Sequence, residues 1–268
     1  MNDNDTNIKS LLEFYHSKYK IVYKANPGNA GDGVIASATY DFFERNELSY
    51  SQYRNDNEYS SHDHLLVFGG GGNLIEGLYT EGKEFIERNV NKFHRIIIMP
   101  STIRGYEEFF RKNVEKLIIL CREVISFEYI QSLGYEKGKN LLLTDDMAFY
   151  LNLSSYMSFV EPAKNIASCF RTDSESLTGE WRDNNHDISL TWNGDYWDNV
   201  YLARNSTRCM INFLEEYNIV NTDRLHVAIL ASLLGKELNF HPNSYYKNEA
   251  VYNYSLLDHY PKSVFVKN

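Results

Sequence analysis

The sequence predicts an α/β protein built from two Rossmann-like halves, and three observations lead to this fold class. The chain has 268 residues, enough for one large domain or two small ones at about 150 residues per domain. In its first half, short apolar runs alternate with longer amphipathic segments, as in a parallel sheet wound with helices. The same alternation begins again after a weakly periodic, polar stretch near residues 151–164. Two such halves facing a central cleft are the simplest architecture.

The first half contains the apolar runs and amphipathic segments of a wound parallel sheet. The predicted strands are Tyr19–Lys24, Leu65–Phe68, Arg95–Met99, Val124–Phe127 and Leu141–Thr144. The predicted helices are Gly33–Asn46, Leu74–Asn91, Tyr106–Leu120 and Glu128–Gly134. Gly, Pro, Asn or Asp follows each strand, and in open α/β sheets these carboxyl-end loops form the ligand crevice.

The second half begins after a cluster of small and polar residues that ends in Glu161-Pro162. This junction predicts an N-terminal domain over residues 1–155 and a C-terminal domain over residues 156–268. The predicted strands there are Asn165–Phe170, Asp187–Thr191, Ile219–Asn221 and Lys236–Phe240. The predicted helices are Tyr196–Tyr217 and Arg224–Leu234, the second closed by Gly235. The absence of repeats and heptads excludes solenoids and coiled coils.

Composition and charge restrict the partners of this chain. It carries 27 Lys+Arg against 36 Asp+Glu, a formal net charge of −9, and no basic cluster, which argues against nucleic-acid binding. No stretch approaches the roughly 20 apolar residues of a membrane span, and the polar N-terminus is unlike a signal peptide. A cytoplasmic protein without stable membrane insertion is therefore expected. Cys121, Cys169 and Cys209 are odd in number, widely spaced and embedded in apolar or mixed segments, which predicts buried free thiols.

A glycine-containing loop, Asn26–Gly33, follows the first predicted strand and opens a helix. Its glycines let the backbone approach a ligand, and the free N–H groups of the helix start suit an anion or a polar substrate. The order G-x-x-G-x-G does not match the dinucleotide fingerprint. Asn29 and Gly31 are candidate ligand contacts, and Asp32 is either a base or a helix cap. A tight strand-to-helix turn without a ligand is equally open.

Four consecutive glycines, Gly69–Gly72, precede Asn73 after the next strand. Each costs about 0.5–1 kcal/mol of chain entropy relative to Ala, which favours a ligand pressed against this backbone. Gly77, Gly82 and Lys83 resemble a P-loop by spacing. Glu84, however, occupies the position where Ser or Thr would bind magnesium, and the resemblance is interpreted as chance.

The segment Thr222–His226 lies at a predicted strand-to-helix junction. Arg224 and His226 there fall in the first helical turn, where a guanidinium, an imidazole and backbone N–H groups can converge on one anion. His is also the side chain best suited to transfer a proton near neutral pH. Arg171, at the end of another predicted strand, supplies a second cation. The competing interpretation pairs Arg171 with Asp173 or Glu175 on the surface.

These segments, in this order, resemble the polysaccharide pyruvyl transferase family from about residue 20 to 242. The most specific piece is Asp223–His226 followed by Val227–Ala231. The matching segments are Asn26–Gly33, Phe68–Asn73, Met99–Ile103, Arg122–Glu128, Thr144–Phe149, Cys169–Asp173 and Thr222–Gly235. Between Asp173 and Tyr217 no pattern aligns, so the resemblance assigns no acceptor contacts.

The resemblance implies a two-domain fold like that of GT-B glycosyltransferases. It also implies transfer of the enolpyruvyl unit of phosphoenolpyruvate onto a sugar of a bacterial surface or extracellular polysaccharide, or its precursor, as a pyruvate ketal. No cofactor or metal is expected. The donor would be held in the C-terminal half by Arg171, Asp223, Arg224 and Leu225. A lipid-linked acceptor would bring the enzyme only transiently to the inner membrane face, because no anchor or basic helix is present.

The chemistry of phosphoenolpyruvate fits these residues. Its carboxylate and phosphate match two arginines and a helix N-terminus. His226 is the expected general acid, and Asp32 or Asp146 the expected base for the acceptor hydroxyl. The acceptor side of the cleft would be bordered, in the N-terminal half, by Asn29, Gly31, Gly70, Gly71, Asn73 and Asp146. Aromatic residues that can be either sugar platforms or core are Tyr79, Trp181, Trp192 and Trp197.

Two other functions remain open. The first is a GT-B-type glycosyltransferase that uses a nucleotide sugar, because His241-Pro242 resembles an element of bacterial sialyltransferases. The Asp/Glu-Gly partner motif of those enzymes is missing after Asp145-Asp146. The second is a non-catalytic relative that binds a glycan or an anion. A metalloenzyme built on His62 and His64 lacks a third nearby ligand. The sequence does not indicate the acceptor sugar, its hydroxyl pair, the ketal stereochemistry or the oligomeric state.

Overall fold

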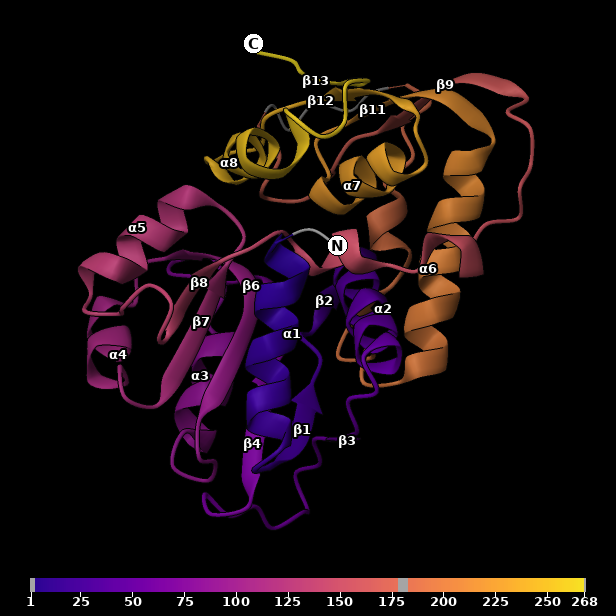
Figure 1. Cartoon of the computed structure of the whole chain (residues 1–268). Coiled ribbons are helices and arrows are strands. Elements are labelled where there is room, and N and C mark those ends of the chain that lie inside the picture. Colours follow the sequence, from indigo (N-terminus) through magenta and orange to yellow (C-terminus); the bar gives the residue numbers. More distant parts are fainter. Residues whose placement is uncertain (1–2, 178–182, 268) are drawn as a thin grey trace. The chain divides into compact units, whose positions relative to one another are not determined.

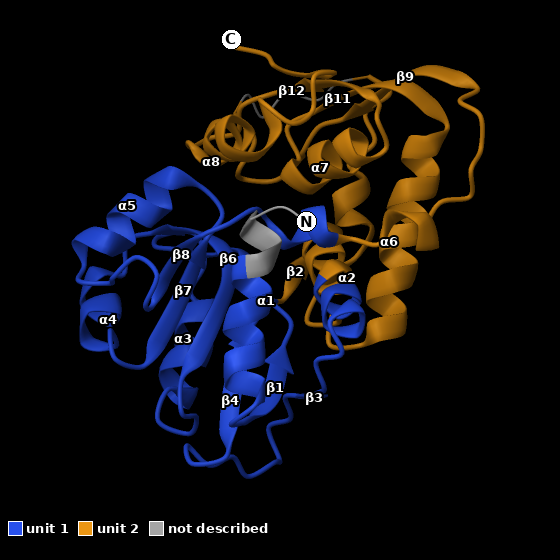
Figure 2. Ribbon diagram, in the orientation of Figure 1, with its two compact units in different colours: residues 1–26, 39–150 blue, residues 27–38, 151–268 orange. Residues whose placement is uncertain are grey.

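The computed structural model describes residues 3–177 and 183–267, and the chain divides into two compact units (Figure 2). The first unit comprises Met1–Asn26 and Thr39–Tyr150, and the second comprises Pro27–Ala38 and Leu151–Asn268. Each unit contains a parallel sheet with helices, so the α/β class is confirmed. The glycine loop and the start of the helix after it belong to the second unit. The predicted boundary after residue 155 and the predicted central cleft stay predictions.

The first unit is built on a seven-stranded parallel sheet with the order β3-β1-β4-β6-β7-β8, in which β5 also pairs with β6 (Figure 1). Its strands are β1 (Lys20–Lys24), β3 (Tyr50–Gln52), β4 (His64–Phe68), β5 (Gly71–Ile75), β6 (Ile96–Arg104), β7 (Leu117–Cys121) and β8 (Leu141–Leu143). Its helices are α1 (Asp3–His16), the second part of α2 (Ala30–Arg45), α3 (Glu81–Asn89), α4 (Glu107–Lys112), α5 (Val124–Ser132) and the 3₁₀ turn η1 (Met147–Tyr150).

The central strands of this sheet are apolar on both faces. All five residues of β7 are buried, as are the first eight residues of β6. Continuous apolar strands are typical of parallel sheets that helices cover on both sides. Helix α5 packs on β6, β7 and β8, and α1 packs on β1. The core of the unit therefore lies between these strands and their helices.

The second unit is built on a four-stranded parallel sheet with the order β13-β12-β11-β9. Its strands are β9 (Lys164–Cys169), β11 (Tyr217–Thr222), β12 (Glu237–Phe240) and β13 (Ser263–Phe265). Its helices are η2 (Leu153–Ser155), η3 (Ile188–Thr191), α6 (Val200–Glu215), α7 (Leu225–Leu233), α8 (Lys247–Val251) and the π-helical turn η4 (Tyr252–Leu256). Helices α6 and α7 pack on β11. A short antiparallel pair, β2 (Gly28–Asn29) with β10 (Asn193–Gly194), joins the glycine loop to this unit.

Four predicted elements are wrong in type or extent. The predicted strand Val124–Phe127 is the start of helix α5, and the strand lies earlier, at β7, which was predicted as the end of a helix. A short run that is apolar on every side cannot be assigned to a strand or a buried helix by periodicity. The helix predicted to begin at Leu74 begins at Glu81, because Leu74 belongs to β5. The predicted strand Asp187–Thr191 is the 3₁₀ turn η3.

Within residues 3–177 and 183–267, none of the helices is both long enough and apolar enough to cross a bilayer.

Candidate active site

The carboxyl edge of the second sheet brings the two predicted arginines together. Strands β9 and β11 are parallel neighbours, with Thr222 opposite Cys169, so the residues that follow each strand emerge at the same edge. The Thr222 hydroxyl donates to the Cys169 carbonyl at 2.6 Å and accepts from the Arg224 backbone N–H at 2.9 Å. Thr222 thus joins the two strands and orients the start of helix α7.

Arg224 is buried and held by two carboxylates. Its Nε and Nη2 lie 2.8 Å and 2.6 Å from the two carboxylate oxygens of Asp187, a bidentate geometry, and its Nη1 lies 2.8 Å from Asp173. Asp187 also accepts from the backbone N–H of Thr172 at 2.9 Å. Asp187 therefore connects the loop after β9 to the start of α7.

Arg171 is also buried and lies in a second group of carboxylates. Its Nε and Nη2 bind the two carboxylate oxygens of Asp173 at 2.7 Å and 3.2 Å, and its Nη1 lies 3.0 Å from Glu175. Glu175 binds Lys247 Nζ at 2.6 Å, and Asp223 accepts from the Arg171 backbone N–H at 2.7 Å. The competing interpretation, in which Arg171 pairs with Asp173 or Glu175, names the partners correctly. It is wrong about their place, because the Arg171 side chain is buried and not on the surface.

Asp173 is the carboxylate shared by both arginines. Its side chain is 32% exposed, against 6% for Glu175 and 7% for Asp187, so it is the member of the cluster most open to solvent. Burial opposes its ionisation, but the hydrogen bonds from Arg171 and the charges of Arg224 and Arg171 lower the pKa of Asp173 below its usual value. The hydrogen bond with Asp173 and the negative charges of Glu175, Asp173 and Asp223 raise the pKa of Arg171 although burial opposes it. Asp173 thus occupies the position where one anion contacts both guanidinium groups.

His226 lies in the first turn of α7 and packs against the glycine loop. A Cβ atom on Gly31 would overlap Nδ1 of the His226 ring, so this contact requires glycine. The Gly31 N–H donates to the side-chain oxygen of Asn29 at 2.8 Å. The Asp32 carboxylate lies so close to Gly28 that a Cβ there would overlap it. The structure therefore gathers Asn29, Gly31, Asp32 and His226 within one unit, although about 195 residues of sequence separate the loop from the histidine.

Asp146, the other predicted base, lies in the first unit and does not belong to this group. Asp146 is fully buried and pairs with the equally buried Arg122 at 2.6 Å, while also accepting from the backbone N–H of Ala148 at 2.8 Å. A carboxylate so enclosed cannot reach an acceptor hydroxyl without rearrangement. This placement favours Asp32 over Asp146 as the base.

The four-glycine run of the first unit has a structural explanation. A Cβ on Gly69 would lie 2.6 Å from the Asn26 backbone nitrogen, and a Cβ on Gly70 would overlap the Pro100 carbonyl. Asn26 donates to the Gly70 carbonyl at 3.1 Å and accepts from the Asn73 side chain at 3.0 Å. Close backbone packing thus accounts for Gly69 and Gly70, and no ligand is required. The acceptor-side roles of Gly70, Gly71 and Asn73 stay predictions.

The aromatic candidates differ in exposure. Trp197 is fully buried, which supports the core interpretation of this residue and rules out the sugar-platform interpretation. Trp192 is 45% exposed. Tyr79 is partly buried, and Trp181 lies outside the described residues.

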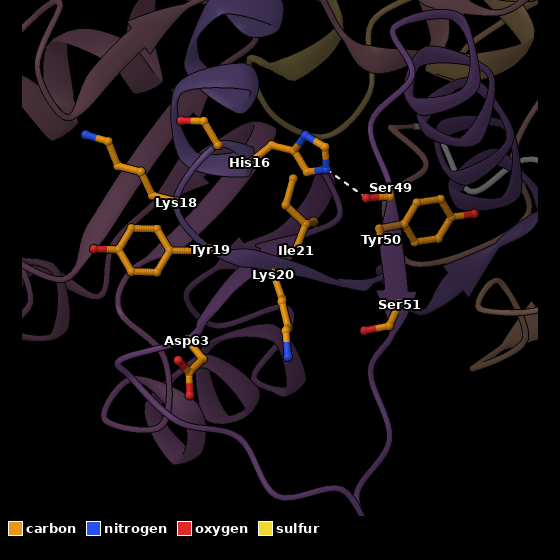
Figure 3. A pocket seen from close by; sticks show the side chains of 10 residues that line it. His16, Lys18, Tyr19, Lys20, Ile21, Ser49, Tyr50, Ser51 and Asp63 are labelled. Atoms are coloured by element: carbon orange, nitrogen blue, oxygen red, sulfur yellow. Dashed lines mark hydrogen bonds between the residues drawn. The ribbon is translucent and has the colours of Figure 1, made fainter.

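A cavity of about 530 Å³ lies in the first unit, where the first residues of β1 meet the end of α1 (Figure 3). His16 Nε2 and the Ser49 hydroxyl form a hydrogen bond of 2.7 Å at its wall. None of the predicted site residues lines this cavity. It opens beside the amino ends of β1 and β3, whereas ligand crevices of open α/β sheets form at the carboxyl ends.

Sequence reasoning missed three partners of the arginine cluster as site residues: Asp187, Glu175 and Lys247. Glu175 stands four positions after Arg171 and was considered only as a surface partner. Asp187 and Lys247 lie in segments without a motif, so no local signal identifies them. Among the described residues, no three His, Cys, Asp or Glu side chains are grouped as metal ligands would be.

Comparison with known proteins connects this geometry to a family. The sequence profile named Polysaccharide pyruvyl transferase matches residues 29–238. A relative from Bacillus subtilis (strain 168), named "Putative pyruvyl transferase EpsO", is 26% identical over 312 aligned positions that cover 97% of this chain and 92% of the relative. A crystal structure of a functionally uncharacterized protein from Klebsiella pneumoniae subsp. pneumoniae NTUH-K2044 is 65% identical, with a TM-score of 0.96 and full coverage of both chains.

Proposed function

This chain belongs to the polysaccharide pyruvyl transferase family, and we propose that it transfers the enolpyruvyl unit of phosphoenolpyruvate onto a sugar as a pyruvate ketal. The acceptor would be a bacterial surface or extracellular polysaccharide, or its precursor. One observation carries the donor assignment: the guanidinium groups of Arg171 and Arg224 converge on the single carboxylate of Asp173. A position between two guanidinium groups suits a carboxylate or a phosphate, and phosphoenolpyruvate carries both.

The donor would take the place of Asp173 between the two arginines. Arg171, Arg224 and Lys247 are already paired with three carboxylates, Asp173, Glu175 and Asp187, so these pairs leave no excess positive charge to attract an anion. Asp173 is the most exposed of the three and can turn towards solvent. Glu175 and Asp187 would stay in place and hold the guanidinium groups.

His226 would act as the general acid in the transfer. It would protonate the methylene carbon of phosphoenolpyruvate, which leaves C2 electron-poor, and a sugar hydroxyl would attack C2 while Asp32 accepts its proton. The bond between C2 and the phosphate oxygen then breaks, and a second sugar hydroxyl closes the ketal on C2. Of the two hydroxyl protons, one balances the proton added to the methyl group and the other leaves with inorganic phosphate.

A thermal-shift titration tests the donor assignment. A ligand that binds only the folded state at 100 times its Kd stabilises that state by about 2.7 kcal/mol. We expect a shift with phosphoenolpyruvate and none with UDP-, GDP- or CMP-sugars, the donors of the alternative glycosyltransferase. Arg224→Ala should abolish the shift. His226→Ala should keep the shift and lose turnover by about 10²–10⁴-fold.

Asp173→Asn is the informative companion variant. Because it removes the competing negative charge and leaves Arg224 in place, it should bind phosphoenolpyruvate at least as tightly as the unaltered protein does. Weaker binding by this variant would mean that Asp173 organises the arginines and is not displaced. A shift with a nucleotide sugar and none with phosphoenolpyruvate would support the glycosyltransferase and overturn the proposed function.

A further inference from the structure

The segment from Asp187 to Trp197 is anchored at both ends to the candidate active site. At its start, Asp187 holds Arg224 through two hydrogen bonds of 2.8 Å and 2.6 Å. At its end, the Trp197 indole is fully buried and donates to the Gly28 carbonyl at 3.1 Å. A Cβ on Gly33 would lie 2.9 Å from this indole ring, so the ring is closely packed on the glycine loop.

Between these anchors, the segment runs beside the loop that contacts His226. Strand β10 pairs with β2 so that Asn193 lies opposite Asn29 and Gly194 lies opposite Gly28. Gly31, which abuts the His226 ring, follows Asn29 by two residues. Asn193 and Gly194 are therefore paired with residues that lie two and three positions before Gly31 in the loop that contacts His226.

Two aromatic side chains of the segment are exposed. Trp192 and Tyr196 are 45% and 46% exposed, and their ring centroids lie 6.2 Å apart at an interplanar angle of 77°. Gly194 lies between them in sequence. A Cβ at this position would lie 2.6 Å from the Tyr196 ring, so the ring packs directly on the Gly194 backbone. The two rings form one exposed aromatic patch, and exposed apolar patches are common at ligand-binding surfaces.

We propose that Trp192 and Tyr196 form the platform on which a pyranose ring of the acceptor lies. A pyranose has an apolar face of C–H groups and a rim of hydroxyls, which matches an aromatic ring with one apolar face and a polar edge. Stacking would leave the hydroxyl rim of the pyranose free for further contacts. This inference rests on the proposed function for the identity of the ligand. It assigns acceptor contacts to the stretch between Asp173 and Tyr217, where the resemblance to the family assigns none.

Saturation-transfer NMR tests the platform directly. The probes are the methyl α- and β-pyranosides of glucose, galactose, mannose and N-acetylglucosamine at millimolar concentration. We expect at least one of these glycosides to receive saturation at its ring C–H protons. Trp192→Ala and Tyr196→Ala should each weaken that binding by about tenfold, whereas Trp192→Phe, which keeps an aromatic face, should retain part of it. Tyr201→Ala is the matched control, because Tyr201 is 83% exposed on neighbouring helix α6 and lies outside the platform.

The thermal shift with phosphoenolpyruvate is measured on the same preparations to separate the two claims. Trp192→Ala should keep the phosphoenolpyruvate shift, which also shows that the variant is folded. Absence of that shift in the unaltered protein would count against the proposed donor and not against the platform. The platform is overturned if the unaltered protein binds none of the glycosides, or if Trp192→Ala binds them as the unaltered protein does.

Discussion

His226 and Gly31 depend on each other for their positions. The imidazole lies where a side chain at residue 31 would be, so the loop and the helix can approach only because residue 31 has no Cβ. Glycine at this position was expected from the sequence to admit a ligand. The structure shows that it admits a side chain of the protein itself.

Gly31→Ala should therefore impair turnover more than stability. The new methyl group would displace the His226 ring by steric overlap, whereas the position lies in the first turn of α2, where Ala is favourable. We expect kcat to fall at least tenfold with a small change in the melting temperature. Gly82→Ala in helix α3, where the nearest heavy atom to the new Cβ is 3.0 Å away, serves as the control and should retain turnover. Equal turnover in both variants would refute the positioning role of Gly31.

Three segments of the second unit meet at the start of α7. The loop after β9 brings Arg171 and Asp173, the segment before η3 brings Asp187, and α7 itself begins after Arg224. Breaking one partner of a buried ion pair is costly, because it leaves the other charge buried without compensation. The cluster therefore holds these segments in register as well as forming the proposed donor site.

The acid stability of the protein should report on Asp173. Because the pKa of Asp173 is lower in the folded state than in the unfolded chain, its carboxylate stabilises the fold above about pH 4, and this stabilisation is lost as the pH falls through the folded pKa. Urea unfolding of Asp173→Asn between pH 3 and pH 6 should show a destabilisation near pH 6 that shrinks towards pH 3. Glu128→Gln, an exposed position on α5, is the control. A destabilisation that is independent of pH would contradict the assignment.

The reactivity of the three cysteines shows whether each of the two units stays closed. Cys121 lies in the first unit and Cys169 in the second, and both are buried, as predicted. The predicted burial of Cys209 is wrong, because Cys209 is exposed on α6. Burial and the nearby charge of Asp187 raise the pKa of Cys169 to about 12, and burial raises the pKa of Cys121 well above its usual value. Both thiols therefore stay protonated and unreactive at pH 8.

Thiol titration with Ellman's reagent at pH 8 should show one rapidly reacting thiol per folded chain and three in urea. Cys209→Ser should remove the rapid reaction and leave the two slow thiols unchanged. A second rapid thiol in the folded protein would show that one of the two units opens under native conditions.

The sequence alone identified most of the elements that build the candidate site. The apolar runs at β1, β4, β9 and β12 and the helix after Thr222 lie close to their predicted positions, because each carries a clear local pattern. One of its errors has a clear physical origin. A short, wholly apolar run such as Leu117–Cys121 has no polar face, so periodicity could not separate a buried strand from a helix.

Local patterns and short motifs are enough to predict the family, the α/β class, and the type and approximate place of Arg171, Arg224 and His226. The partners of these three residues, in contrast, follow from the folded arrangement of the chain. Asp187 lies 37 positions from Arg224, and Lys247 lies 72 positions from Glu175. Such pairs depend on which strands are neighbours and on how their register aligns their carboxyl ends. Loops that meet at a sheet edge are brought together by the fold as a whole, so the sequence of one loop does not identify the loop that it contacts.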